Sequence, residues 1–261
     1  MTVRRISLVA WHAFVEHARD RIVYGLGAFF LLLGLLLATA LVAGPLSGGE
    51  EVKIVKDLGL ALVELAGALM AVVMGVGLIA RETDRRSILS LLAKPLPRWE
   101  FVVGKYAGLV TTIVASVALM GTALFTVLAL IEAADLRLII ALAMIAGELA
   151  LLTAVAVFFS VFSSSALVSV VLTTGVFVAG QLSADLRSFG SITDVPVWVA
   201  SSMALVGWAL PDFSSFDVKA QIVHGEPIAH RIILLTLLYG ALYATGLIAA
   251  AVALFSRREF R

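Results

Sequence analysis

Six apolar runs divide this chain of 261 residues, and each is about as long as a helix that crosses a bilayer. A helix rises 1.5 Å per residue, so roughly 20 apolar residues cover the hydrocarbon core. Hydrophobic residues make up 61% of the chain and charged residues 14%, which is typical of membrane proteins. The sequence therefore predicts an all-α polytopic membrane protein, a single transmembrane domain over 1–261 with six transmembrane helices. The six runs are 22–42, 58–80, 106–130, 138–159, 166–184 and 232–255.

Basic residues are divided unequally between the two sides that these runs define. With the N-terminus inside, 13 of the 19 Lys and Arg residues lie on the cytoplasmic side and 6 on the other. Because loops rich in Lys and Arg stay in the cytoplasm, we expect a multi-pass protein of the inner (plasma) membrane with both termini cytoplasmic. The first run begins too late and is too long for a cleavable signal peptide, so we expect it to remain as a span.

Residues 81–105, between the second and third runs, form the most charged long segment and hold six of the basic residues. Ile88, Leu91 and Leu92 fall at i, i+3 and i+4, so they share one face of a short amphipathic helix. Two prolines follow and end that helix. The pattern fits a helix along the cytoplasmic face that turns back into the membrane, and it fits an ordinary basic loop equally well.

The sequence of residues 81–105 resembles the loop after the second span in ABC-2 type permeases. These are the membrane subunits of a class of ABC exporters, similar to type V exporters. The likeness extends to span count and spacing over nearly the whole chain. It is nearest to the branch that includes the permease associated with maturation of multi-copper enzymes such as nitrous oxide reductase. The sequence departs from the family at Arg86-Ser87, where Gly-Thr is frequent, and this affects the detail of docking. The matching residues are Glu82, Ser87-Ile88-Leu89, Leu91-Leu92, Lys94-Pro95, Arg98, Glu100-Phe101 and Gly104-Lys105.

The resemblance implies a set of partners. Residues 81–105 would be the coupling loop, whose helix docks on an ATP-binding subunit. Two ATP-binding cassette ATPase subunits would carry the ATP and Mg, and a second permease copy, identical or a close paralogue, would complete the complex in the lipid bilayer. A periplasmic partner protein stays open, and no nucleic acid is expected. The residues expected to couple to the ATPase are Glu82, Arg85, Arg86, Ile88, Leu91, Leu92 and Arg98.

Two further segments fit the resemblance. Residues 4–21 form a mildly amphipathic helix, which predicts either an N-terminal interfacial elbow helix or a solvated helix. Residues 185–231 form an outer loop far longer than a connector requires. Within it, Asp194 as N-cap and Pro196 in the first turn predict a helix start, and the following apolar run is too short to span. We expect a re-entrant or interfacial gate with Trp198 as a candidate gate residue; an outer helix packed on the spans is the alternative.

Polar residues inside the apolar runs are the candidates for a path or gate. Glu64 lies in the second run and Glu148 near the middle of the fourth. Acids at this depth are costly, so they are expected to face a partner or water. Ser169, Thr173 and Gln181 lie in the fifth run, and in the resembling permeases the second and fifth spans line the path between two subunits. For each of these residues a satisfied structural hydrogen bond is the alternative.

Small residues recur on the second run. Gly67, Ala71 and Gly75 are spaced four apart and lie on one side of a helix. Small-xxx-small series let another helix approach closely in a membrane. The sequence therefore predicts tight packing of this helix against a neighbour.

Several kinds of chemistry are excluded. The chain has no cysteine, and none of its four histidines lies in an apolar run. The sequence therefore predicts no catalytic residue, no metal site and no cofactor in this chain, which argues against an intramembrane protease. We find no nucleotide-binding loop, so the chain is expected not to be an enzyme, with ATPase activity in a separate subunit.

The expected function is that of the permease subunit of an ATP-binding cassette exporter, which couples ATP hydrolysis to substrate movement or force transmission. An ion-coupled secondary transporter is one alternative, supported only by Glu64 and Glu148. A subunit that transmits force to an outer partner without a transported substrate is another. The sequence leaves the substrate open.

Overall fold

Four long helices form the body of the protein. The computed structural model describes residues 7–11, 26–35, 51–85, 97–163, 165–188, 196–224, 226–227 and 229–257, with the backbone alone at 51, 78–85, 98, 197, 200 and 257. Every regular element in these ranges is helical. The four helices long and apolar enough to cross a membrane are α3 (Glu51–Arg85), α5 (Arg98–Leu130), α6 (Leu138–Phe162) and α11 (His230–Arg257).

Helix α6 lies at the centre of this bundle. It packs against α3, α5 and α11, and also against α7. Its sequence is apolar all round, and a helix of that kind is stable only where every face is covered. Polar residues are therefore rare on α6, and each must find a partner inside the protein.

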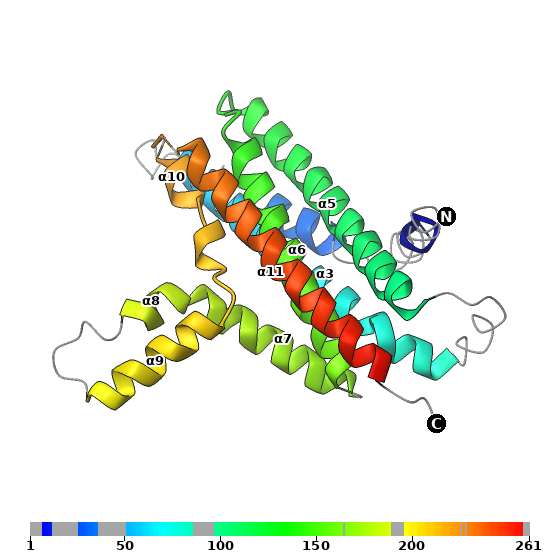
Figure 1. The fold of residues 1–261 in the computed structure, drawn as a ribbon. Helices are drawn as coiled ribbons and strands as arrows, with labels where there is room; N and C mark the ends of the chain where they lie inside the picture. Colours follow the sequence, from blue (N-terminus) through cyan, green and yellow to red (C-terminus); the bar gives the residue numbers. More distant parts are fainter. Residues whose placement is uncertain are drawn as a thin grey trace.

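The bundle has two distinct ends (Figure 1). The α5–α6 turn, α10 and the starts of α3 and α11 lie together at one end, which we call the α10 end. The end of α3, the start of α5, the α6–α7 turn and the end of α11 lie at the opposite end. The last turn of α3 and the first turn of α5 therefore lie at the same end of the bundle as the last turn of α11.

The predicted close approach on the second run is confirmed. A Cβ at Gly75 would lie 2.5 Å from Ala156 Cβ, and a Cβ at Gly67 would lie 2.3 Å from Leu149 Cδ1, both on α6. Ala71, between them, is completely buried. The small residues thus let α3 approach the central helix along two turns of contact.

Shorter helices connect α6 to α11. Helix α7 (Ala166–Gln181) packs on α6 and α3, whereas α8 (Ser183–Ser188) and α9 (Val197–Ala209) pack on each other beside the bundle (Figure 1). The chain then returns to the bundle through the 3₁₀ turn η3 (Ser214–Phe216) and α10 (Lys219–Val223). The long connection predicted at 185–231 thus contains four short helices in its described parts.

Two aromatic residues fix the return segment. Phe216 is 1% exposed and fits over Gly147 of α6 and Gly240 of α11, where any larger residue would meet its ring. Phe213 is fully buried and packs against Gly180 of α7. The segment between α9 and α10 is therefore a packed part of the bundle.

Three details of the sequence-based model differ from the structure or lie beyond it. The fifth predicted span, 166–184, is a helix only to Gln181. This helix, α7, has 16 residues and is therefore about 24 Å long. Pro196 precedes α9, with an extended ψ of 136°, and does not lie in its first turn; the predicted N-cap Asp194 is outside the described residues. In the first predicted span and the predicted elbow, the structure describes helix at 26–35 and 7–11. Four helices are thus long and apolar enough to span a membrane, and the other two predicted spans remain predictions.

Candidate functional site

A cluster of four polar side chains joins four helices near the α10 end. Glu64 comes from α3, Glu148 from α6, Gln181 from α7 and Lys219 from α10. The Lys219 ammonium forms an ion pair with Glu64 Oε2. Gln181 Nε2 donates to Glu148 Oε1 at 2.7 Å and reaches Glu64 Oε1 at 3.4 Å. We call this set the Glu64–Lys219 cluster.

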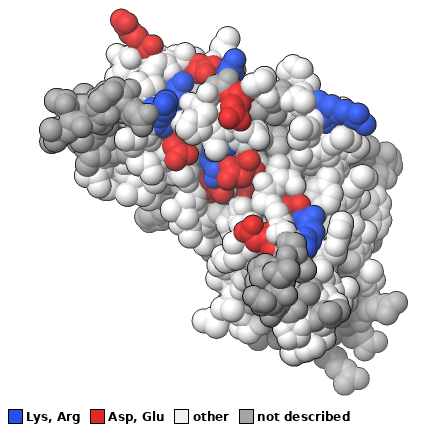
Figure 2. All heavy atoms as spheres, turned by 90° about the vertical axis from the view of Figure 1, so that its left-hand side faces the viewer, with Lys and Arg blue, Asp and Glu red and all other residues white. Residues whose placement is uncertain are grey.

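The cluster is largely shielded from solvent. Glu148 is 2% exposed, and the side chains of Glu64 and Lys219 are 15% and 17% exposed. Figure 2 looks onto the side of the molecule where α8, α9 and α10 lie, and shows charges of both signs running across a surface that is otherwise uncharged. Within the cluster, Glu148 thus lies in the interior, whereas Glu64 and Lys219 keep a small exposed fraction.

Lys219 is held in its charged form. Burial alone would lower the pKa of its ammonium group, but the hydrogen bond and charge of Glu64, with the charges of Asp217 and Glu148, raise it above its usual range. The backbone N–H of Lys219 also donates to Asp217 Oδ1 at 3.1 Å, which fixes the start of α10. Lys219 thus supplies a permanent positive charge to a carboxylate that α3 carries into the bundle.

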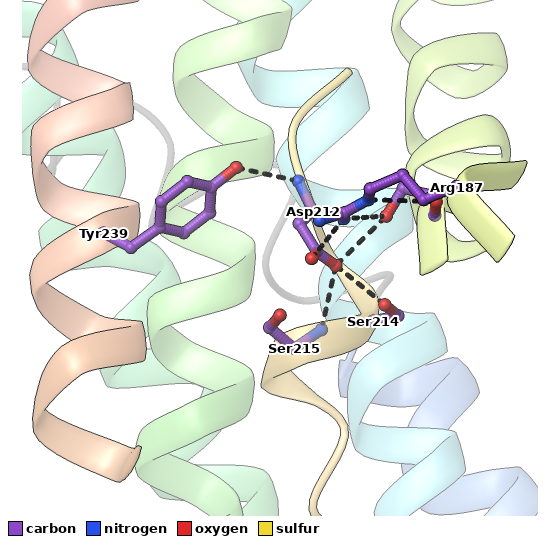
Figure 3. A network of polar contacts seen from close by, with 6 residues as sticks. Arg187, Asp212, Ser214, Ser215 and Tyr239 are labelled. Carbon is purple, nitrogen blue, oxygen red and sulfur yellow. Dashed lines mark hydrogen bonds and ion pairs between the residues drawn. The ribbon is translucent and has the colours of Figure 1, made fainter. Parts of the chain in front are cut away.

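A second network holds the segment before α10. Asp212 forms an ion pair with Arg187 of α8 and accepts hydrogen bonds from Ser214 Oγ at 2.7 Å, Ser183 Oγ at 3.1 Å and the Ser215 N–H at 3.2 Å (Figure 3). Burial favours the neutral acid, but these hydrogen bonds outweigh it and lower the pKa of Asp212 to about 2. Asp212 is therefore ionised at any physiological pH.

Two tyrosines attach this network to α11. The Asp212 N–H donates to Tyr239 Oη at 3.0 Å (Figure 3), and Tyr243 Oη donates to the last carbonyl of α9 at 3.1 Å. The guanidinium of Arg187 lies 5.2 Å from the ring centre of Trp208, a cation–π geometry that links α8 to α9. The α8–α9 pair is thus fastened to the bundle by polar contacts.

The structure separates the predicted path residues into two groups. It brings Glu64, Glu148 and Gln181 into direct contact. Ser169 and Thr173 are buried, but their hydroxyls donate to backbone carbonyls, Ser169 to Phe159 at 3.0 Å and Thr173 to Ser169 at 2.7 Å. Trp198 is 74% exposed at the start of α9 and belongs to neither network. Its gate role stays a prediction.

Three of the residues predicted to couple to an ATPase lie at the opposite end of the bundle. Glu82 and Arg85 fall in the last turn of α3 and Arg98 begins α5; for all three the structure describes the backbone alone. Their docking role stays a prediction. The others lie outside the described residues: Arg86, Ile88, Leu91 and Leu92.

Three charged residues of the two networks were not predicted from the sequence. Lys219 and Arg187 contributed only to the count of basic residues outside, and Asp212 had no assigned role. One signal was present for Lys219, because two carboxylates in apolar helices call for a cation and this lysine stands in a partly apolar loop. Within the described part of the chain, no three His, Cys, Asp or Glu residues lie where they could hold a metal ion.

Comparison with known families gives one match. The model of the family described as ABC-2 family transporter protein matches residues 7–195. The matched region includes Glu64, Glu148 and Gln181, and ends before Lys219. The comparison with curated proteins gave no match.

Proposed function

The chain belongs to the ABC-2 family of transporter proteins, and we propose on that ground that it is the permease subunit of an ATP-binding cassette exporter. The family match over residues 7–195 is the observation that carries the proposal. The four apolar helices support it, because a permease must be embedded in the membrane. ATP hydrolysis would take place in separate subunits, with ATP and Mg bound there.

Helix α3 gives the proposal a physical route between the two ends of the bundle. It is continuous over 35 residues, about 50 Å, from the segment proposed to couple to the ATPase to the α10 end. Glu64 lies on the same helix and pairs with Lys219. Closure of the ATPase subunits would push on the coupling segment, tilt α3, and so move one partner of this ion pair.

The remaining features of the proposal follow the family. Two ATPase subunits and a second permease copy would form the complex in the inner membrane, with both termini and the end of the bundle opposite α10 in the cytoplasm. The exposed apolar side chains of α7, including Leu167 and Val171, supply a surface for that copy. Six spans, an elbow helix, a coupling helix and an outer gate complete the proposed architecture.

We propose the kind of process that the permease carries out and leave its substrate open. The nearest resemblance is to the permease branch for maturation of multi-copper enzymes such as nitrous oxide reductase, so either export of a substrate or transmission of force to a periplasmic partner fits. An ion-coupled secondary transporter is not favoured, because the family match points to an ATP-driven system.

Co-purification tests the proposal. A docking helix depends on apolar anchors more than on exposed ion pairs, which contribute about 0–1 kcal/mol each. We therefore expect Leu91→Asp to abolish recovery of a co-expressed ATPase subunit from detergent, and Arg85→Ala to weaken it partly. The matched control is Leu136→Asp, the same substitution at an exposed residue of the α5–α6 turn.

The outcomes separate docking from folding. Size-exclusion chromatography checks that each variant stays monodisperse. Full recovery of the ATPase with Leu91→Asp would refute the coupling role. Loss of the ATPase with Leu136→Asp as well would show that the effect is not specific to residues 81–105.

A further inference from the structure

The Glu64–Lys219 cluster contains more acid than base. The charged and titratable groups that face one another are Glu64 of α3, Glu148 of α6, Lys219 of α10 and, ahead of α10, Asp217. Asp217 is 51% exposed, so water screens its charge. The shielded part of the cluster therefore holds two carboxyl groups, one ammonium and the neutral amide of Gln181.

Charge balance decides how the cluster is protonated. Two carboxylates that share a site do not both ionise readily, and net charge inside an apolar helix bundle is costly. One proton shared by the pair would leave a single negative charge, which the docked ammonium of Lys219 neutralises. If Lys219 left, that charge would stay behind at the same depth without its partner.

We propose that the Glu64–Glu148 pair is a proton-binding site, which takes one proton from the outer solution each time Lys219 leaves Glu64. The proton comes from water and binds the carboxylate that has lost the ammonium. Lys219 keeps its own proton as it enters the solvent. The pair is then neutral, and docking of Lys219 releases the same proton. This exchange goes beyond the ATP-driven function proposed above and does not depend on it.

The packing allows α10 to leave while its neighbours stay. Helix α10 has five residues and packs on α3 and α6 through the Lys219 ion pair and Ile222, which is 1% exposed; its N-cap residue Val218 is buried as well. The preceding segment is fixed separately, by Phe213, Phe216 and the Asp212 network. Undocking therefore involves few residues and leaves the aromatic anchors in place.

Thiol labelling can measure this exchange in a chain that has no cysteine of its own. Ile222→Cys is protected while α10 is docked and reacts when it leaves, whereas the exposed neighbour Gln221→Cys reacts in both states. The ratio of the two rates cancels the pH dependence of the thiol itself. His224→Gln and His230→Gln in the reporter background remove the two imidazoles of the outer loop. The full chain is studied in lipid nanodiscs without an ATPase between pH 5 and 8.

The proposal predicts a definite pH profile. When α10 leaves the bundle, the glutamate pair binds one proton. The labelling rate of Ile222→Cys divided by that of Gln221→Cys therefore rises by up to about tenfold for each unit that the pH falls. Glu64→Gln leaves no charge behind, and we expect a high ratio that does not change with pH. Lys219→Met tests the same point from the loop side, without altering the spans, and gives the same result. Asp217→Asn, the matched control, keeps the pH dependence.

Three results would overturn the proposal. The ratio could stay flat in the parent reporter, it could keep its full pH dependence in Glu64→Gln or Lys219→Met, or it could lose that dependence in Asp217→Asn. Because no ATPase is present, none of these results bears on the permease assignment. Conversely, loss of ATPase binding would leave the labelling profile unchanged.

Discussion

The contact between α3 and α6 should be intolerant of one additional methyl group. In Gly75→Ala the new Cβ would lie 2.5 Å from Ala156 Cβ, whereas unstrained carbon contacts are about 3.5–4.0 Å. Neither carbon can rotate away, so the helices must separate by about 1 Å along their packed length. Overpacking of this kind costs about 1–3 kcal/mol, and we expect the upper part of that range.

Two other glycines provide graded controls. In Gly67→Ala the clash is with the end of the Leu149 side chain, which can change rotamer, so the loss should be smaller, at about 1 kcal/mol. Gly246 has no atom within 4 Å of an added Cβ, so Gly246→Ala should be neutral or stabilise by up to about 1 kcal/mol. Thermal unfolding in detergent measures all three. Equal stability of Gly75→Ala and Gly246→Ala would refute the packing argument.

Three further predictions concern two ion pairs and the orientation in the membrane. Glu64→Lys or Lys219→Glu alone should weaken docking of α10 by up to about 3–5 kcal/mol, the cost of an unpaired buried charge, and the double variant should restore its protection from labelling. Hydrogen bonding lowers the pKa of Asp212 to about 2, so the stability that the Asp212 carboxylate contributes is complete above pH about 4 and is lost as the pH falls through 2. Asp212→Asn should therefore lower the unfolding temperature at pH 7 and reduce the further loss of stability between pH 4 and pH 2. With an impermeant thiol reagent on intact cells, Ser188→Cys should react and Ser87→Cys should not; labelling of the latter would reverse the orientation.

Apolar run length and local rules predicted much of the fold. The long helices follow from runs that only a membrane or a closed core can cover, and the α3–α6 contact follows from small residues spaced four apart. Glu64 and Glu148 are candidates because acids at membrane depth need partners, and Gln181 because the fifth span lines the path in the resembling permeases. The structure brings these three residues into contact.

The cation of the cluster could not be predicted in the same way. Lys219 is 155 residues away from Glu64 in sequence, and their pairing depends on how Phe213 and Phe216 fix the return segment. Those rings fit over glycines of other helices, a match that no local pattern encodes. The early end of α7 at Gln181 likewise depends on tertiary context, since the sequence continues with the apolar Leu182 and the chain carries no helix breaker there.

Labelling of Ile222→Cys in the complete complex tests most directly whether ATPase action reaches the α10 end of the bundle. The variant is purified with its ATPase subunits and labelled without nucleotide, and again with ATP bound and hydrolysis blocked. The account predicts that ATP changes the labelling rate, and that Leu91→Asp removes this response, because α3 connects the coupling segment to Glu64. An identical labelling rate with and without ATP, in a complex that hydrolyses ATP normally, would contradict it.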